Sequence, residues 1–231
     1  MVIYQPQEGY CYNSDTIFLY DFFSKLPVKG DVLDVGSGTG ILALLTKRDF
    51  AAHVSAVEVQ EEFVRYAKIN ARANRLDIRI YMGNFLHMVF DRKFDYVLSN
   101  PPFYHKDVLR PKNKMVDIAR YSGHLPPEEL IAKVGSILKP RGSFVFCYDA
   151  KQVAQILFIL KERKFNVERM RLIHPKADRS ASLVMIHAKK GSKSLCETLP
   201  PLVVFEGEHY SHEAKEIFKR VGVHSIKCKI S

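Results

Sequence analysis

Three glycines follow an acidic residue in the stretch Asp-Val-Gly-Ser-Gly-Thr-Gly at residues 34–40. Closely spaced glycines let the backbone turn tightly and allow a ligand to approach bare peptide groups. Loops that cradle a pyrophosphate carry Gly-x-Gly-x-x-Gly, and here Ile41 stands where that pattern needs its third glycine. The carboxylate of Asp34 also suits a positively charged group better than a phosphate. The stretch therefore favours a small ligand with a cationic end.

The pattern Asp-x-Gly-x-Gly-x-Gly resembles motif I of class I methyltransferases. This resemblance implies that the ligand is S-adenosylmethionine and that the residues binding it include Asp34, Gly36, Gly38 and Gly40. Glu58 lies eighteen positions beyond Gly40, at the end of the next apolar run. A carboxylate at that place can accept hydrogen bonds from both ribose hydroxyls. An exposed charge at a strand end is the alternative interpretation of Glu58.

Two further cofactor contacts are predicted where a third apolar run ends. The methyltransferases that this chain resembles usually carry an acidic residue at position 84, which receives the amine of the cofactor adenine. Asn84 departs from that pattern, but its amide oxygen can still accept one hydrogen bond. Phe85 can pack on the face of the adenine, with a core aromatic as the alternative interpretation.

The sequence Asn100-Pro101-Pro102-Phe103 directly follows the apolar run at residues 94–98. Two prolines fix the backbone and remove two amide donors, so that carbonyl oxygens are free to point into a site. The Asn100 side-chain oxygen and the Pro101 carbonyl can each accept an N–H bond from a planar, conjugated amine. Two acceptors on one NH2 group favour its pyramidalisation and aim its lone pair, while Phe103 can stack on a base. The alternative is a rigid turn without chemistry.

These four residues resemble the Asn/Asp-Pro-Pro-Tyr/Phe motif of methyltransferases that act on conjugated amines. Transfer is then expected to be an in-line displacement from sulfonium to nitrogen. It needs no metal, covalent intermediate or strong general base, because the extra proton of the product is acidic and leaves to solvent. Adenine N6 and a glutamine side-chain amide both present a conjugated NH2 group, so the motif alone leaves both acceptors open.

Both motifs follow predicted strands, and the strands alternate with helices along most of the chain. Apolar runs bounded by turn residues predict strands at residues 31–35, 54–57, 78–81, 94–98, 143–148, 165–173 and 182–188. Helical patterns occupy residues 14–26, 41–48, 61–75, 128–138, 153–163 and 211–221. This alternation predicts an α/β fold of the Rossmann-like class I methyltransferase type, with an open, mostly parallel seven-stranded sheet and helices on both faces. Because ligands of such sheets bind at the carboxyl ends of the strands, both motifs should open onto one edge.

The 231 residues suit one methyltransferase domain. Within it we expect an N-terminal segment at 1–30 that covers the cofactor and substrate, a catalytic core at 31–190 and a C-terminal addition at 191–231. The opening residues lack the basic and apolar segments of an export signal, and no apolar run is long enough for a membrane helix, so we expect a cytoplasmic protein without membrane contact. The four cysteines are too scattered for a disulfide frame or zinc site.

Thirty-five Lys and Arg residues against twenty-five Asp and Glu give a formal charge of +10, which favours a polyanionic partner such as nucleic acid. A merely solvated basic surface is the alternative. Candidate RNA-binding cations follow the acceptor motif directly: Lys106, Arg110, Lys112 and Lys114. Later cations that are expected to fall on the same edge are Lys176, Arg179, Lys189, Lys190 and Lys193. The histidines are not spaced like metal ligands, and no stripe indicates an oligomer, so we expect a monomer without metal.

Over nearly its full length the chain is similar to the bacterial tRNA methyltransferases that modify N6 of adenine 37 in a valine tRNA. Residues 5–16 resemble the Gln-Pro-x-x-Gly-Tyr-x-Phe-x-x-Asp-Ser opening of that family, and residues 200–205 resemble its C-terminal end. Asn84 replaces an acid, and Arg-Tyr-Ser at residues 120–122 replaces an Arg-His-Glu-like sequence. The resemblance implies an adenine in RNA as the acceptor, and these departures leave the exact tRNA open.

Three other functions share part of this pattern. A protein methyltransferase that modifies a glutamine amide would share the acceptor motif, but it gains little from a charge of +10. Methylation of adenine in DNA or ribosomal RNA is a close variant of the leading hypothesis. A silent RNA-binding module that kept only the fold is disfavoured by the intact motifs, and cofactor binding would distinguish it.

Overall fold

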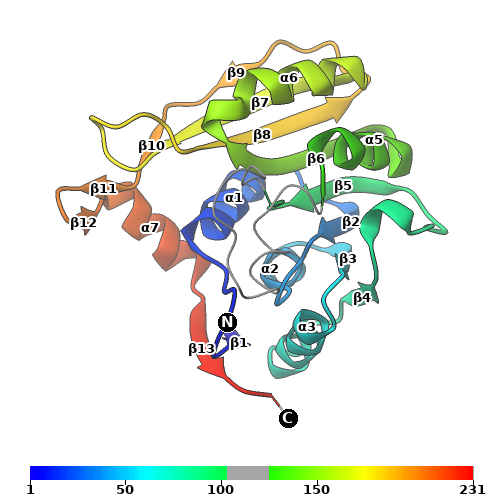
Figure 1. The fold of residues 1–231 in the computed structure, drawn as a ribbon, viewed down its shortest axis with the longest axis vertical. Helices are drawn as coiled ribbons and strands as arrows, with labels where there is room; N and C mark the ends of the chain where they lie inside the picture. Colours follow the sequence, from blue (N-terminus) through cyan, green and yellow to red (C-terminus); the bar gives the residue numbers. More distant parts are fainter. Residues whose placement is uncertain (103–124, 231) are drawn as a thin grey trace.

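A computed structural model of the chain describes residues 1–102 and 125–230. The central sheet contains, in chain order, β2 (Gly30–Val35), β3 (Ala52–Glu58), β4 (Arg79–Met82), β5 (Phe94–Ser99), β6 (Leu138–Asp149), β7 (Phe165–His174) and β8 (Leu183–Lys190). In space the order is β7-β8-β6-β5-β2-β3-β4, so the chain crosses over at the β2–β5 pair (Figure 1). These seven strands confirm the predicted sheet.

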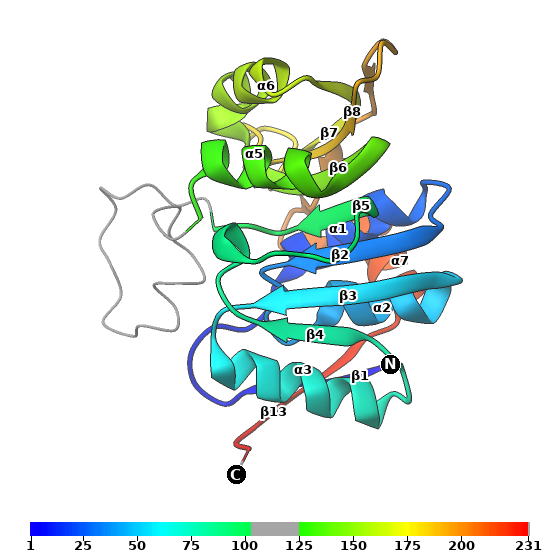
Figure 2. The same cartoon turned by 90° about the vertical axis from the view of Figure 1, so that its right-hand side faces the viewer.

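The sheet is parallel from β4 to β6, and β8 alone runs antiparallel to its two neighbours β6 and β7. Figure 2 shows the arrowheads of β2, β3, β4 and β5 pointing to the same side, which places the carboxyl ends of these strands at one edge. Two strands of two residues each, β9 (Glu197–Thr198) and β10 (Leu202–Val203), pair with β7 and extend the sheet to nine strands. The sequence predicts neither, because two residues carry no periodicity.

Helices cover both faces of the sheet, as predicted. They are α1 (Ser14–Ser24), α2 (Ile41–Asp49), α3 (Glu61–Ala73), α5 (Pro127–Ile137), α6 (Val153–Glu162) and α7 (His212–Val221). Apolar side chains of α1, α2 and α7 share one core, whereas those of α5 and α6 form a second core on the opposite face (Figure 1). None of the described helices is long and apolar enough to cross a membrane.

Helix α1 is buried from Thr16 to Phe23, because it lies between the sheet, α2 and α7. Its N-cap is Asn13, whose side chain accepts a hydrogen bond from the backbone N–H of Asp15 at 3.2 Å. Ser14 and Asp15 follow Asn13 in the chain, and all three residue types are good caps, so the pattern of residue types alone does not distinguish them. The cap fixes where the first helix begins and thus where Thr16 points.

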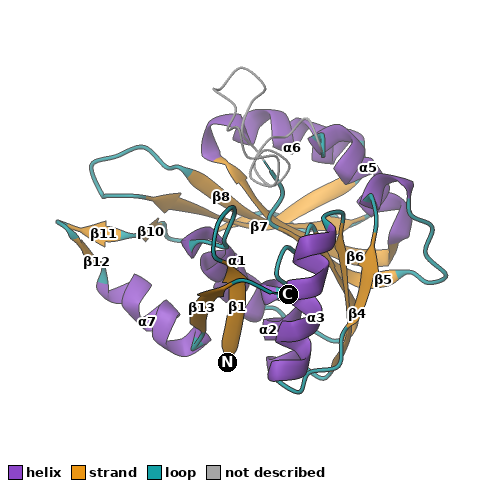
Figure 3. Ribbon diagram, turned by 60° about the horizontal axis from the view of Figure 1, so that its bottom comes forward, coloured by secondary structure: helices purple, strands orange, loops and turns teal. Residues whose placement is uncertain are grey.

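The two ends of the chain form a second, two-stranded parallel sheet of β1 (Val2–Pro6) and β13 (His224–Cys228) (Figure 3). The side-chain oxygens of Asn70 on α3 and of Asn74, the C-cap of α3, accept hydrogen bonds from backbone N–H groups of β1 at 2.8 and 3.0 Å. Both amides also donate back to β1 carbonyl groups. These carboxamides therefore pair the open edge of β1 in place of a third strand. The structure also describes the hairpin β11 (Phe205–Glu206) and β12 (His209–Tyr210), and the short 3-10 helices η1 (Phe85–His87) and η3 (Ala150–Gln152).

Candidate active site

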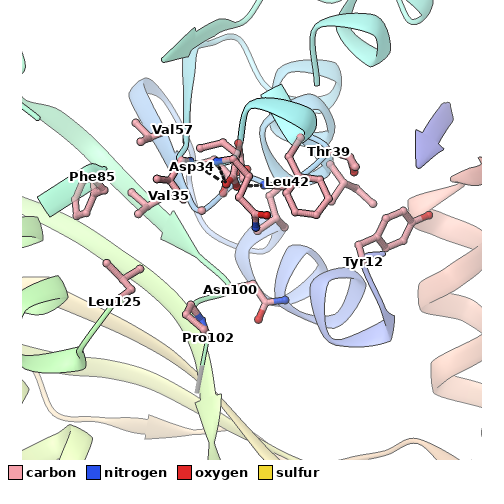
Figure 4. A pocket seen from close by; sticks show the side chains of 18 of the residues that line it. Tyr12, Asp34, Val35, Thr39, Leu42, Val57, Phe85, Asn100, Pro102 and Leu125 are labelled. Carbon is pink, nitrogen blue, oxygen red and sulfur yellow. Dashed lines mark hydrogen bonds between the residues drawn. The ribbon is translucent and has the colours of Figure 1, made fainter. Parts of the chain in front are cut away.

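A pocket opens at the carboxyl ends of β2, β3 and β5 and brings the two sequence motifs together (Figure 4). Of the predicted residues, the following line it: Asp34, Gly36, Gly38, Glu58, Asn84, Phe85, Asn100 and Pro102. Tyr10, Tyr12 and Thr16 add a wall from the N-terminal segment, and Phe63 adds a contact from α3. Segments that are distant in the sequence thus share one cavity, as the edge argument predicts.

Of the predicted cofactor and acceptor residues in the described part of the chain, Gly40 and Pro101 do not line this pocket. Gly40 has φ of +86° and begins α2, and a Cβ atom placed on it would lie 3.2 Å from the Cβ of Ala67 in α3. Its glycine therefore allows close packing of α2 against α3. Pro101 is buried, and the acceptor role of its carbonyl stays a prediction.

The backbone of the glycine loop turns back onto β3. Gly36 and Ser37 donate their N–H groups to the carbonyl of Val57 at 2.9 and 3.1 Å. Gly36 and Gly38 have φ of +70° and +53°, a conformation that side chains with a Cβ atom rarely adopt. A Cβ atom at either position would meet nothing within 4 Å, so the backbone conformation, rather than lack of space, requires glycine there.

Asp34 is buried, with 1% of its surface exposed. Its Oδ2 atom accepts from the backbone N–H of Ala43 at 3.1 Å, whereas Oδ1 has no partner among the described residues. The hydroxyl oxygens of Ser37 and Thr39 are also buried without partners there. Buried polar atoms are nearly always hydrogen-bonded, so these three atoms on the pocket wall indicate a polar ligand.

Burial, opposed by the hydrogen bond from the Ala43 N–H and reinforced by the nearby charge of Glu58, raises the pKa of Asp34 from 3.8 to about 7. A cation bound beside Asp34 would favour the ionised form. The pocket thus contains a buried acid, and its pairing with a positive charge stays a prediction.

Glu58 is 5% exposed and binds three backbone N–H groups. Its Oε2 atom accepts from Gly38 at 2.8 Å, and its Oε1 atom accepts from the next two residues at 2.8 and 2.9 Å. Burial raises its pKa, while these three bonds act in the opposite direction. The interpretation of Glu58 as an exposed charge is therefore wrong. The carboxylate fixes the glycine loop, and Oε2 retains a lone pair for a ligand.

Asn84 and Phe85 stand on the same pocket wall and begin η1. The Asn84 side-chain oxygen accepts the backbone N–H of Leu86 at 3.0 Å, so one of its two lone pairs is already used as a helix cap. Phe85 is 4% exposed and lies 6.2 Å from the ring of Phe90 between centroids. Its ring belongs to the core and also lines the pocket. The interpretation as a core aromatic is therefore confirmed, and contact with the adenine stays a prediction.

Asn100 is held at both ends of its carboxamide. Its Nδ2 atom donates to Thr16 Oγ1 at 2.9 Å, and its Oδ1 atom accepts from Cys147 Sγ at 2.8 Å. Just before it, the Ser99 hydroxyl donates to the carbonyl of Val35 at 2.9 Å and ties the end of β5 to β2. The acceptor motif is therefore fixed to the strand that carries Asp34. Thr16 and Cys147 were not predicted, because no sequence pattern pairs residues so far apart.

A family comparison agrees with this geometry: the methyltransferase small domain family matches residues 13–169. The chain belongs to this methyltransferase family. The cofactor is S-adenosylmethionine. The matched range spans the glycine loop, Glu58 and Asn100, and it ends within β7.

Individual relatives of this methyltransferase match over most of the chain. The tRNA1(Val) (adenine(37)-N6)-methyltransferase of Dyadobacter fermentans is 26% identical over 188 residues, covering 80% of this chain and 78% of that protein. The protein of the same name from Phocaeicola vulgatus is 26% identical over 161 residues, covering 69% of this chain and 68% of that protein.

Among solved structures, a predicted O-methyltransferase of Agrobacterium tumefaciens has a TM-score of 0.68 at 17% identity, covering 93% of this chain and 100% of that chain. The ribosomal protein L11 methylase of Lactobacillus delbrueckii subsp. bulgaricus has a TM-score of 0.59 at 22% identity, over 82% and 94% of the two chains. These structures share the methyltransferase fold.

Several predicted residues lie outside the described part of the methyltransferase. These are Phe103, Lys106, Arg110, Lys112, Lys114 and the departure at residues 120–122. Among the described residues, no group of three or more His, Cys, Asp or Glu side chains could hold a metal ion.

The later cations divide between the two edges of the sheet. Because β8 is antiparallel, the β7–β8 turn lies beside the carboxyl end of β6, where Ala150 donates to the carbonyl of Ser182 at 3.1 Å. Lys176 and Arg179 are exposed in this turn and so stand at the edge that carries the pocket. Lys189, Lys190 and Lys193 lie at the opposite edge, and their predicted placement is wrong because the sequence does not reveal the reversal of β8.

Proposed function

We propose that this methyltransferase acts on the N6 amine of an adenine in RNA, most specifically adenine 37 of a valine tRNA. The observation that carries the proposal is that Asn100 and Pro102 line the same pocket as Asp34 and Glu58. An amine acceptor held by Asn100 would therefore meet the cofactor site directly. The two relatives described above carry names with this activity, and the pocket edge carries exposed cations.

The pocket offers S-adenosylmethionine three polar atoms that have no partner within residues 1–102 and 125–230. Asp34 Oδ1 suits the ammonium group of the cofactor, and the hydroxyls of Ser37 and Thr39 can pair with its polar atoms. Glu58 Oε2 is proposed to accept from the ribose, Asn84 to accept from the adenine amine, and Phe85 to contact the adenine ring. When bound, the cofactor supplies an electrophilic methyl group on a sulfonium.

Glu58→Ala is expected to weaken cofactor binding by about 1–3 kcal/mol, because it removes charge-assisted hydrogen bonds and releases the N–H of Gly38. Isothermal titration calorimetry with S-adenosylmethionine measures the change. Glu62→Ala, an exposed carboxylate on α3, is the control and should leave the affinity as it is. Equal affinities of the wild type and Glu58→Ala would remove Glu58 from the cofactor site.

Asn100 is proposed to accept an N–H bond of the target amine through Oδ1, and the carbonyl of Pro101 to accept the second. Adenine N6 is a poor nucleophile because its lone pair is delocalised into the ring. Two acceptors favour the pyramidal amine, in which the lone pair is free to attack, and they orient it toward the cofactor pocket. Phe103 is proposed to stack on the extruded base.

RNA binding is proposed to use the cations at the pocket edge. Lys176 and Arg179 project from a turn that the His174 ring closes through a 2.8 Å contact with the Arg179 carbonyl. Replacing both cations by serine is expected to reduce the salt dependence of tRNA affinity by a slope of about 1–2, because roughly two phosphate contacts are lost. Fluorescence anisotropy over a range of salt concentrations measures this slope.

The matched control for this pair lies at the opposite edge. Arg163 and Lys193 are exposed at the end of α6 and beyond β8, so replacing both by serine makes the same change in net charge away from the pocket. We expect that control to keep the wild-type slope. Equal slopes in the two double variants would mean that the charge acts only through the net field of the protein.

The deciding experiment is nucleoside mass spectrometry of tRNA incubated with the methyltransferase and labelled S-adenosylmethionine. N6-methyladenosine at position 37 of valine tRNA is the expected product. Label in a protein glutamine, in DNA or in ribosomal RNA alone would assign the acceptor to one of the alternatives. Size-exclusion chromatography with light scattering tests the proposed monomer.

A further inference from the structure

The carboxamide of Asn100 is held by side chains from two other elements. Thr16 on α1 accepts from its Nδ2 atom at 2.9 Å, and Cys147 on β6 donates to its Oδ1 atom at 2.8 Å. Thr16 is 4% exposed and Cys147 is fully buried. A primary amide presents two ends of similar shape, so only such partners can determine which end faces a given direction.

The partners of Asn100 have donor and acceptor properties that favour one orientation. A hydroxyl such as that of Thr16 can accept or donate, whereas a thiol is a weak donor and a still poorer acceptor from an amide N–H. Burial raises the pKa of the Cys147 thiol well above its ordinary value, so the thiol keeps its proton and can donate it. The reversed amide would place two donors, Nδ2–H and S–H, against each other, and this arrangement is unfavourable.

We propose that Cys147 and Thr16 are positioning residues that set the direction of the Asn100 oxygen toward the target amine. This inference rests on the proposed function, in which Asn100 Oδ1 accepts a hydrogen bond from that amine. Oδ1 has two lone pairs, so it can accept from Cys147 and from the amine at once. The thiol thereby orients the oxygen without touching the substrate.

The arrangement also connects the N-terminal segment with the acceptor site. Thr16 lies in the first turn of α1, four residues after Tyr12, and both residues line the pocket. The backbone N–H of Tyr12 donates to Gln5 Oε1 at 2.8 Å, which anchors the segment to β1. The position of this segment therefore determines the position of the Thr16 hydroxyl, which accepts a hydrogen bond from Asn100 Nδ2.

Steady-state kinetics of four variants test the proposal. Cys147→Ala removes the donor and Thr16→Val removes the acceptor, and each is expected to lower kcat for tRNA methylation roughly tenfold, because one buried polar atom of Asn100 loses its partner. Cys147→Ser and Thr16→Ser keep a hydroxyl and are expected to remain within about threefold of wild type. KM for tRNA and calorimetric affinity for S-adenosylmethionine should stay unchanged in the two Cys147 variants, because Cys147 does not line the pocket.

Val145→Ala is the matched control, because Val145 is buried two residues before Cys147 in the same core cluster but does not line the pocket. It is expected to lower thermal stability and leave kcat unchanged. Wild-type kcat in Cys147→Ala, or an equal fall of kcat in Val145→Ala, would overturn the positioning role.

In the Asn100→Ala background, Cys147→Ala should cause no further loss of kcat. An active Asn100→Ala protein would instead contradict the proposed function itself, so the two failures are distinguishable.

Discussion

Asn100→Ala is expected to lower turnover 100-fold or more, on the order of 3 kcal/mol in the activation free energy, while cofactor affinity barely changes. The reason is that the Asn100 oxygen acts mainly as the nitrogen changes geometry, so its loss is felt in the transition state rather than in the bound ground state. Asn100 shares the pocket with Asp34, but the hydrogen bonds of its carboxamide run to Thr16 and Cys147. Single-turnover methylation of tRNA and calorimetry with S-adenosylmethionine measure the two effects separately.

Two further variants give this prediction its controls. Asn166→Ala removes a carboxamide from β7, outside the pocket, and should leave turnover unchanged. Asn100→Asp keeps two acceptor oxygens but loses the N–H that Thr16 receives, so we expect its activity to lie between those of the wild type and Asn100→Ala. Near wild-type methylation by Asn100→Ala would show that the Asn-Pro-Pro segment is a turn rather than the acceptor site.

The order of apolar runs and turn residues is sufficient to predict the seven long strands and the meeting of both motifs at one edge. That prediction succeeds because parallel strands separated by helices must present their carboxyl ends together. It does not extend to the direction of β8, since an antiparallel strand has the same composition as a parallel one. Because β8 runs antiparallel, Lys189 near its end lies at the edge opposite the pocket, contrary to the prediction. The same reversal brings the β7–β8 turn, with Lys176, to the pocket edge, as predicted.

Side-chain partners are less predictable than positions. The sequence places Glu58 beside the glycine loop, but it does not show that the carboxylate binds Gly38 as well as facing the pocket. Pairings such as that of Asn100 with Cys147 join residues 47 positions apart, and that of β1 with β13 joins the two chain ends. Such contacts depend on how the layers pack, which no local pattern encodes.

Asp34→Asn is expected to have opposite effects on binding and stability. The substitution removes the negative charge that is proposed to pair with the cofactor ammonium, so binding of S-adenosylmethionine should weaken by about 2–4 kcal/mol. The same charge is buried without a cation in the cofactor-free protein, and its removal should raise the free energy of unfolding by about 1–3 kcal/mol at pH 8. Calorimetry and chemical denaturation measure the two changes.

The pH dependence of the free energy of unfolding tests whether the buried charge of Asp34 lowers the stability of the protein. Because folding raises the pKa of Asp34 from 3.8 to about 7, the folded protein binds more protons than the unfolded chain between these values. The free energy of unfolding of the wild type should therefore fall, relative to Asp34→Asn, as pH rises from about 4 through about 7, and the two proteins should have similar stability at the acidic end.

Asp21→Asn is the contrasting control, because Asp21 is equally buried at 2% exposure but pairs with Lys25 at 2.9 Å and with Arg220. Removing its charge should destabilise the protein and leave cofactor affinity unchanged. A destabilised Asp34→Asn protein that still binds the cofactor tightly would mean that Asp34 serves the fold alone, since a carboxylate kept for a cationic ligand must cost stability when that ligand is absent.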